Sequence, residues 1–142
     1  MIRKYEVADT DLIINIWSES SQIAHPFLED KFVQKVRKDM REIYLPNTET
    51  WVFEEENIII GFISMIGNEI GGLFVSPKHF SKGIGSKLVN FISEFHDILE
   101  VEVFKKNSIG CGFYKKYGFS FIKEYKHEEA KNVILRLRYS KK

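Results

Sequence analysis

The sequence predicts an α/β (α+β) fold with seven strands and four helices in the order β-α-α-β-β-β-α-β-α-β-β. Two observations lead to this prediction. Short runs of β-branched and aromatic residues are bounded by polar turns, which is typical of strands. Between them, apolar residues recur every three to four positions, which is typical of amphipathic helices. With 142 residues and neither a linker nor a repeat, residues 1–142 are expected to form a single domain.

The chain begins with one strand and two helices. Ile2–Val7 alternates apolar and polar residues, which favours a strand. Asp9 is a candidate N-cap for a helix over residues 10–22. Pro26 can occupy the first turn of a second helix, which is expected to end near Ile43.

The remaining elements follow from apolar runs and turn residues. Strands are expected at residues 50–55, 57–67, 69–77, 98–104, 119–126 and 132–140. A glycine turn in "SPKHFSKGIGSKLVNFI" (Ser76–Ile92) leads into a helix over residues 82–96. A shorter helix is expected between Asn107, a candidate N-cap, and Gly118, a candidate stop.

Composition narrows the class of protein. Hydrophobic residues make up 44% of the chain, and the formal net charge of +1 gives no argument for a nucleic-acid or membrane partner. No apolar run approaches the ~20 residues of a membrane span, and the N-terminus does not resemble a signal peptide. The single cysteine, Cys111, excludes an intrachain disulfide, and the four histidines lack metal-ligand spacing. We therefore expect a cytoplasmic protein without a metal.

The glycine turn has the character of an anion site. Gly83 and Gly85 lie at the start of a helix, where unpaired N–H groups carry partial positive charge. Residues 70–93 contain no Asp or Glu, whereas Lys78, Lys82 and Lys87 all fall in or beside this turn. Such a turn can bind a phosphate group, although a tight strand-to-helix turn without a ligand is the simpler alternative.

Two common phosphate loops do not fit this turn. A dinucleotide-binding turn requires a third glycine at the position of Leu88. A Walker loop requires glycine at the position of Phe80 and a Gly-Lys-Ser/Thr order, whereas this chain has Gly85-Ser86-Lys87. A nucleotide-phosphate binding protein is therefore a weaker alternative.

A second group of polar residues follows in "EVFKKNSIGCGFYKKYGF" (102–119). Asn107 and Tyr114 are seven residues apart, which places them on one face of a helix. Glu100 and Glu102 alternate with valines, so both carboxylates point to the same side of a strand. The simpler interpretations are a core tyrosine and a solvent-facing glutamate.

Two glycines and the cysteine lie within this same short helix. Gly110 and Gly112 are each less favourable there than alanine by about 1 kcal/mol, so they indicate close approach by another group or a loosely formed helix. Cys111 is interpreted as a small apolar filler rather than a nucleophile.

These segments together resemble the GNAT N-acetyltransferase superfamily. The resemblance lies in "LFVSPKHFSKGIGSKLV" (73–89), "NSIGCGFYKKYGF" (107–119) and "HPFL" (25–28). It implies a GNAT-like fold with a central mixed, mostly antiparallel sheet of about seven strands flanked by four helices, and acetyl-CoA as the acetyl donor. The sequence departs from the family pattern at Phe80, where Arg or Gln is common, and at Gly110, where Ala is common.

The resemblance assigns residues to acetyl-CoA. The backbone of Leu73, Phe74 and Val75 should pair with the pantetheine arm. The pyrophosphate should bind the N–H groups of Lys82, Gly83, Ile84, Gly85 and Ser86. Asn107 should contact the cofactor arm, and Tyr114 should lie beside the thioester sulfur.

The predicted reaction is direct attack of a primary amine on the thioester. A tyrosine with a pKa near ~10 is protonated at pH 7, so Tyr114 is the candidate general acid for the departing thiolate. A lysine-like amine with a pKa of ~10.4 must lose a proton, and Glu102 is the candidate general base, with Glu69 as its rival. A non-catalytic domain that senses acetyl-CoA or CoA is the alternative.

The acceptor itself is not identified by the sequence. His25 and Phe27 are candidate acceptor-binding residues; His25 could also be a second base or simply a residue at the start of a helix. Trp17 and Trp51 could line a pocket, but core packing explains both. The partner is expected to be a small-molecule or peptide amine, and the protein a monomer or homodimer.

Overall fold

The computed structural model describes residues 1–141, which fold into one seven-stranded sheet with helices packed on it. The strands are β1 (Ile2–Lys4), β2 (Glu49–Glu55), β3 (Ile58–Ile66), β4 (Glu69–Val75), β5 (Ile98–Phe104), β6 (Ser120–His127) and β7 (Asn132–Ser140). Their order in the sheet is β1-β2-β3-β4-β5-β7-β6. Every neighbouring pair is antiparallel except β4 and β5. The prediction of a mixed, mostly antiparallel sheet is confirmed.

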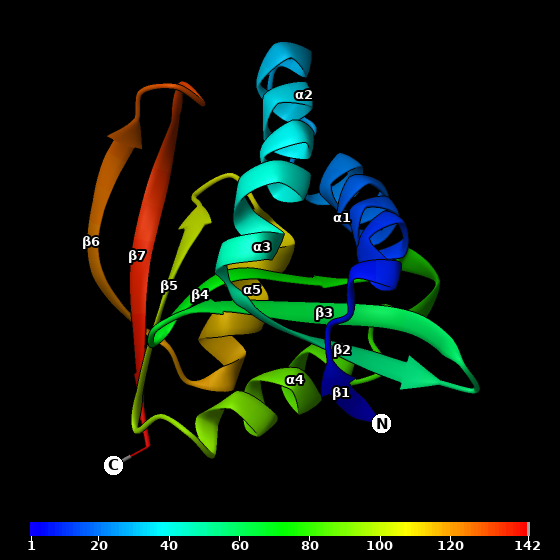
Figure 1. Cartoon of the computed structure of the whole chain (residues 1–142). Coiled ribbons are helices and arrows are strands. Elements are labelled where there is room, and N and C mark those ends of the chain that lie inside the picture. The colour runs from blue at the N-terminus through cyan, green and yellow to red at the C-terminus, as the bar shows by residue number, and fades with distance from the viewer. Residues whose placement is uncertain (142) are drawn as a thin grey trace.

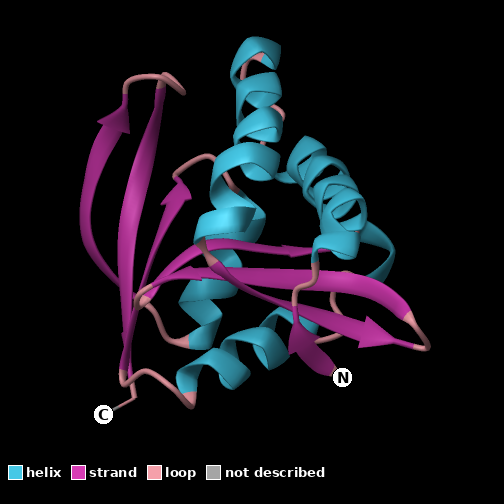
Figure 2. Cartoon of the chain, in the orientation of Figure 1, coloured by secondary structure: helices cyan, strands magenta, loops and turns pink. Residues whose placement is uncertain are grey.

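The helices also follow the predicted order (Figure 2). They are α1 (Thr10–Ala24), α2 (Asp30–Asp39), α3 (Leu45–Asn47), α4 (Ile84–Ser93) and α5 (Ser108–Tyr117). The π-helical turn Met40–Tyr44 joins α2 to α3 into one helical body, so residues 1–141 contain four helical bodies apart from two short 3-10 turns. Among residues 1–141, no helix has both the length and the apolar character needed to cross a membrane.

Two apolar clusters hold the layers together on opposite faces of the sheet. In Figure 1, α1 lies above strands β2–β4, while α4 and α5 lie below them. Strand β3 serves both clusters, because Phe62 packs toward α1 whereas its neighbour Ile63 packs toward α4. Trp17 is buried in the cluster that contains Phe62. Trp51 packs against the cluster on the other face, where its ring centroid lies 4.9 Å from that of Phe91.

The sheet divides between β4 and β5. These strands pair only at Glu69–Glu100 and Ile70–Val101, whereas β3 and β4 stay paired as far as Val75. Figure 1 shows the result: β5, β7 and β6 rise together on the left, away from β1–β4. One edge of β4 therefore lacks a partner strand over most of its length and faces an opening in the sheet.

Several predicted boundaries are wrong for local reasons. Helix α1 begins at Thr10 as predicted, but the Asp9 side chain does not cap it, because its carboxylate accepts hydrogen bonds of 2.9 and 3.0 Å from Arg3. Pro26 lies in a turn, and α2 begins only at Asp30. Helix α4 begins at Ile84, after the left-handed backbone of the glycine turn.

Candidate active site

A cavity of about 1,450 Å³ lies where β4 and β5 separate. It is larger than the ~300–1,000 Å³ of most small-molecule sites, so it has room for a long ligand and a second reactant. Residues from α1, α2, β4, β5 and α5 line it, together with the turn before α4. The opening in the sheet is thus the place where the candidate residues can meet a ligand.

Strand β4 forms one wall of this cavity. Leu73, Phe74 and Val75 all line it, and their pairing with β3 occupies only one edge of the strand. The N–H and C=O groups on the other edge face the opening and can pair with an extended ligand. The predicted cofactor-binding strand segment therefore lies on the cavity.

The turn before α4 presents backbone N–H groups at one end of the cavity. Ser81 and Gly83 have φ angles of 65° and 79°, which bend the chain sharply before the helix. The helical ladder begins with the N–H of Lys87, which donates to the carbonyl of Gly83 at 3.0 Å. The N–H groups of residues 84–86 precede this ladder, and such groups bind anions.

Four of the five residues predicted to bind the pyrophosphate line the cavity, namely Gly83, Ile84, Gly85 and Ser86. The side chain of Lys82 instead points toward His79, with 3.5 Å between Nζ and Nδ1. Phe80, where the resembling family commonly has Arg or Gln, lines the cavity. Gly85 also permits helix packing, since a Cβ there would lie 3.1 Å from the ring of Phe113 on α5.

Asn107 caps α5 as predicted. Its Oδ1 accepts a hydrogen bond of 2.8 Å from the N–H of Gly110. Its Nδ2 lies 3.1 Å from Nε2 of His25, whose Nδ1 lies 2.9 Å from Oγ of Ser21. The group expected to approach Gly110 is therefore the Asn107 side chain, because a Cβ on Gly110 would lie 2.5 Å from that Nδ2.

His25 lies at the C-terminal end of α1 and lines the cavity. It is not a helix-start residue, because α2 begins five positions later, at Asp30. Burial lowers the pKa of His25 to about 4, so the imidazole is neutral at physiological pH. Phe27 is not among the cavity-lining residues; its ring packs against His25 and Phe104 at 5.8 and 5.7 Å.

Tyr114 is buried on α5 and lines the cavity. Its ring packs between Phe113 and Phe119. Among residues 1–141, the Tyr114 hydroxyl has no hydrogen-bond partner. Every side-chain N or O atom that is fully buried in these residues does have a partner, so this hydroxyl is not fully buried. The hydroxyl must therefore reach the cavity. Burial raises the pKa of Tyr114 well above its ordinary value, so it carries its proton at neutral pH.

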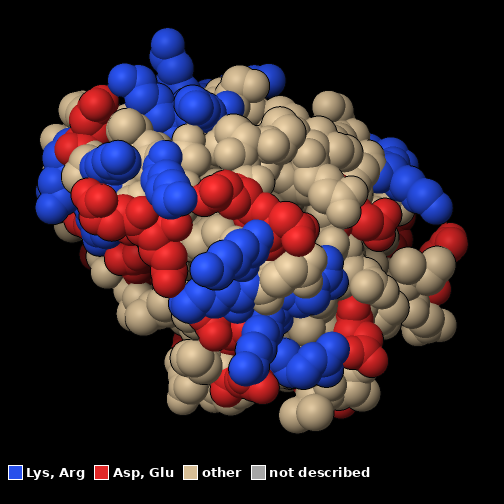
Figure 3. All heavy atoms as spheres, turned by 90° about the horizontal axis from the view of Figure 1, so that it is seen from above, with Lys and Arg blue, Asp and Glu red and all other residues tan. Residues whose placement is uncertain are grey.

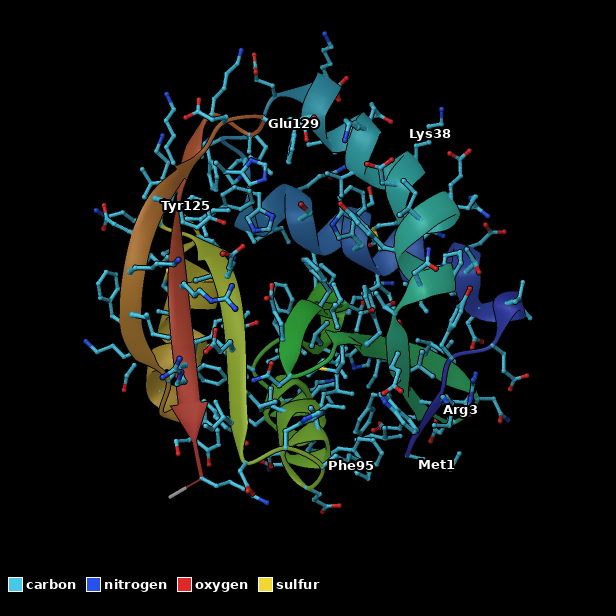
Figure 4. All side chains as sticks on the ribbon, turned by 60° about the vertical axis from the view of Figure 1, so that its left-hand side comes forward. Met1, Arg3, Lys38, Phe95, Tyr125 and Glu129 are labelled. Atoms are coloured by element: carbon cyan, nitrogen blue, oxygen red, sulfur yellow. The ribbon has the colours of Figure 1, made fainter. Side chains whose placement is uncertain are left out.

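Two carboxylates, those of Glu69 and Glu102, also line the cavity. Arg136 donates to both of them and to Glu100, at 3.0, 3.2 and 2.7 Å respectively. The hydroxyl of Tyr125 donates to Glu102 at 2.8 Å, from the edge strand where Figure 4 labels it. Both candidate bases thus belong to one charged cluster, and the side-by-side orientation expected for Glu100 and Glu102 is confirmed.

The sequence reasoning missed the cations of this cluster. Arg136 and Arg138 alternate along β7 and face Glu102 and Glu100 across the ladder with β5. Alternating arginines on one strand and alternating glutamates on another were the available signal. Arg138 and Arg136 together hold the pKa of Glu100 below its ordinary value.

Cys111 stands outside the cavity lining. Its Sγ faces the carbonyl oxygens of Phe104 and Lys105 at 3.6 and 3.8 Å, and burial raises the pKa of the thiol. A raised pKa leaves little thiolate for nucleophilic attack. Among residues 1–141, no three His, Cys, Asp or Glu side chains form a group that could hold a metal.

The face seen from above carries charged side chains of both signs (Figure 3). In Figure 3, acidic and basic side chains interleave over the face seen from above. This distribution agrees with the formal net charge of +1. The net charge therefore gives no argument for long-range attraction of a charged ligand to the whole molecule.

Comparisons with known proteins agree with this geometry. Residues 46–121 match the family described as the acetyltransferase (GNAT) domain. The peptidyl-lysine N-acetyltransferase YiaC of Escherichia coli K12 is 32% identical over 123 residues, which cover 86% of this chain and 84% of that protein.

Solved structures show the same fold. The solution structure of apo-form YjaB from Escherichia coli superimposes with a TM-score of 0.89 at 26% identity, covering 98% of this chain and 96% of that one. The PaiA N-acetyltransferase of Thermoplasma acidophilum, solved in complex with coenzyme A, has a TM-score of 0.81 at 21% identity, covering 98% of each chain.

Proposed function

Since this chain belongs to the GNAT acetyltransferase family, we propose that it transfers the acetyl group of acetyl-CoA to the side-chain amine of a lysine in a peptide or protein. One observation carries the proposal: the cavity between β4 and β5 joins open backbone N–H groups, a tyrosine hydroxyl and two carboxylates. The acceptor class is supported by the relative YiaC, which is named a peptidyl-lysine N-acetyltransferase.

The donor lies along β4 and ends at the glycine turn. Its pantetheine arm pairs with the open edge of Leu73–Val75, as an added strand would. Its pyrophosphate binds the N–H groups at the start of α4, with the backbone N–H of Lys82 nearby. Asn107 contacts the arm, because it lines the cavity between β5 and α5.

Tyr114 is the proposed general acid. The amine nitrogen attacks the thioester carbonyl carbon, the new C–N bond forms, and the C–S bond breaks. The departing sulfur takes the hydroxyl proton of Tyr114. The raised pKa of Tyr114 means only that its hydroxyl still carries the proton at neutral pH, before the thiolate departs.

Glu102 is the proposed base for the proton that the amine loses. Its carboxylate lines the cavity, but Arg136 and Tyr125 already occupy part of it. The amine becomes far more acidic once it has begun to attack, so its proton is lost after the C–N bond starts to form. Glu69, whose carboxylate accepts a hydrogen bond from Arg136, remains the rival.

An acetyl-CoA sensor is the second candidate function. A sensor needs the donor site but not a hydroxyl at the thioester. The Tyr114 hydroxyl has no structural partner among residues 1–141, so its presence in the cavity favours catalysis.

The test is release of free thiol from acetyl-CoA with three acceptor sets: lysine peptides blocked at the N-terminus, peptides with a free N-terminus and no lysine, and small amines. We expect turnover with the blocked lysine peptides. Turnover only with the other sets would overturn the acceptor class. Tight acetyl-CoA binding without turnover on any set would favour the sensor.

A further inference from the structure

The contact between His25 and Asn107 joins two segments that lie 82 residues apart in the sequence. An amide nitrogen can only donate, so Nε2 of His25 accepts the N–H of Asn107. Nδ1 of His25 must then carry the ring proton and donate it to Oγ of Ser21. His25 is thereby held in one neutral tautomer.

The orientation of the Asn107 amide is fixed from both ends. Its oxygen accepts from Gly110, so its nitrogen must be the atom that faces His25. The –NH₂ group has two N–H donors, and His25 uses one of them. The second N–H stays available to a ligand, and Asn107 lines the cavity.

We infer that His25 is a positioning residue: it holds the Asn107 amide so that the second N–H donates to a carbonyl of the bound acetyl-CoA arm. This inference rests on the proposed function for its ligand. It gives His25 no contact with the reacting atoms. The lone pair of Nε2 is occupied by Asn107, which removes the second-base interpretation of His25.

The surroundings of His25 suit this role. Its ring contacts three aromatic rings, those of Phe27, Phe74 and Phe104, at centroid distances of 5.8, 6.5 and 5.2 Å. Phe74 lies on β4 and Phe104 ends β5, so the ring bridges the two strands where the sheet opens. Burial is the sole cause of its lowered pKa, and no charged group contributes.

Nuclear magnetic resonance of the ¹⁵N-labelled protein tests the tautomer without any turnover. We expect long-range ¹H–¹⁵N correlations to show His25 protonated at Nδ1 and bare at Nε2, down to about pH 5. In Asn107→Asp, which keeps a good N-cap, a carboxylate replaces the donor. The pKa of His25 should then rise above ~6.5. Protonation of Nε2 in the unaltered protein would overturn the inference.

Kinetics then test the consequence for the donor. His25→Phe keeps a ring but loses the acceptor, and should raise the KM for acetyl-CoA about three- to tenfold, as expected for one lost hydrogen bond. His25→Gln restores an acceptor oxygen and should recover most of that loss. His96→Gln, which lies outside the cavity lining, is the matched control and should leave the KM unchanged.

An unchanged KM in His25→Phe, or a Gln variant as impaired as the Phe variant, would overturn the role. Calorimetric binding of acetyl-CoA gives the same comparison without an acceptor. If the unaltered protein binds acetyl-CoA but turns over no amine, the proposed function fails while the affinities still decide the role of His25.

Discussion

The two walls of the cavity are built in different ways. The donor wall consists of β4, the turn before α4, and helices α4 and α5, and it packs on one apolar cluster. The proposed acceptor wall consists of the carboxylates of Glu69 and Glu102 with Arg136, which binds both, whereas His25 acts on the donor side through Asn107. The donor wall is formed by residues that are close in sequence, whereas the acceptor wall depends on polar pairs such as Arg136–Glu69, 67 residues apart.

This difference separates the two tasks of a transferase. A rigid apolar base suits a donor that is the same in every turnover. Polar side chains, which can re-pair with one another or with a ligand, suit the binding of a charged acceptor. Changes in the donor wall should therefore alter acetyl-CoA binding or the chemical step, and changes in the acceptor wall should alter stability and amine recognition.

The largest expected effect comes from the hydroxyl on the donor wall. Tyr114→Phe should lower kcat by about 10²–10⁴-fold, because the departing thiolate loses its proton donor. The melting temperature should stay nearly unchanged, since the hydroxyl has no partner among residues 1–141. Steady-state thiol release and thermal unfolding measure the two quantities.

Tyr139→Phe is the matched control for that change. Tyr139 packs against Phe119 and Gly118, away from the cavity lining, so removing its hydroxyl should not alter kcat. Equal turnover by the unaltered protein and Tyr114→Phe would keep the enzyme but discard Tyr114 as the acid.

On the acceptor wall, Arg136→Met should lower the free energy of unfolding by about 1–3 kcal/mol at pH 7. The change leaves three carboxylates beside one another without their shared cation. Arg138→Met should be milder, because Arg138 is half exposed and pairs with Glu100 alone. Urea unfolding of both variants measures the difference.

The loss of unfolding free energy in Arg136→Met should depend on pH. The pKa of Glu100 is lowered in the folded protein, so its stabilisation is present above the unfolded value of ~4.3 and is lost as the pH falls through the folded value. The gap between the unaltered protein and Arg136→Met should therefore be widest near neutral pH and narrow below about pH 4. A gap that widens in acid would contradict the ion-pair explanation.

The same contrast explains what could be read from the sequence. The element order, the glycine turn before α4 and the cap at Asn107 were predicted correctly, because each depends on residues that are close together in the sequence. Alternation along strands and periodicity along helices are likewise local signals.

The side-chain pairs made by His25 and Glu102 could not be predicted from the sequence. Nothing near His25 in the sequence indicates that its ring accepts from Asn107, and nothing near Glu102 indicates Arg136. Asp9 was misjudged for a more local reason, since Arg3 on β1, six residues earlier, donates to the carboxylate that would have capped α1. Pairs made by the tertiary fold override local propensity.

The glycine turn offers a sharper test of the donor wall. Gly83 has a φ of +79° and an unobstructed Cβ position, so Gly83→Ala should cost about 1–2 kcal/mol from backbone strain alone. The substitution should also displace the N–H groups of the turn and thereby weaken acetyl-CoA binding, which calorimetry measures. Gly67→Ala, with a φ of +61° in the turn between β3 and β4, carries a similar strain outside the cavity.

The two glycine variants should thus lose similar stability, but only Gly83→Ala should lose affinity. Equal affinity in both would mean that the turn does not bind the pyrophosphate, and the donor wall would need another anchor.

The smallest effects are expected inside α5, whose cap residue Asn107 contacts His25. Gly112→Ala should stabilise the protein by roughly 0.5–1 kcal/mol, because alanine is the better helix former and nothing lies within 4 Å of the new Cβ. Gly110→Ala gains the same propensity, but its Cβ would lie 2.5 Å from Nδ2 of Asn107 and 3.0 Å from Cγ2 of Val103.

Gly110→Ala should therefore be less stable than Gly112→Ala, and its Asn107 amide should move away from His25. Chemical unfolding compares the two variants, and the His25 ring correlations report the displaced amide. Equal stabilisation with an unchanged His25 tautomer would show that Asn107 shifts without loss. In that case Asn107 would accommodate the added methyl group and keep its hydrogen bond to His25, so the predicted displacement of the amide would be wrong.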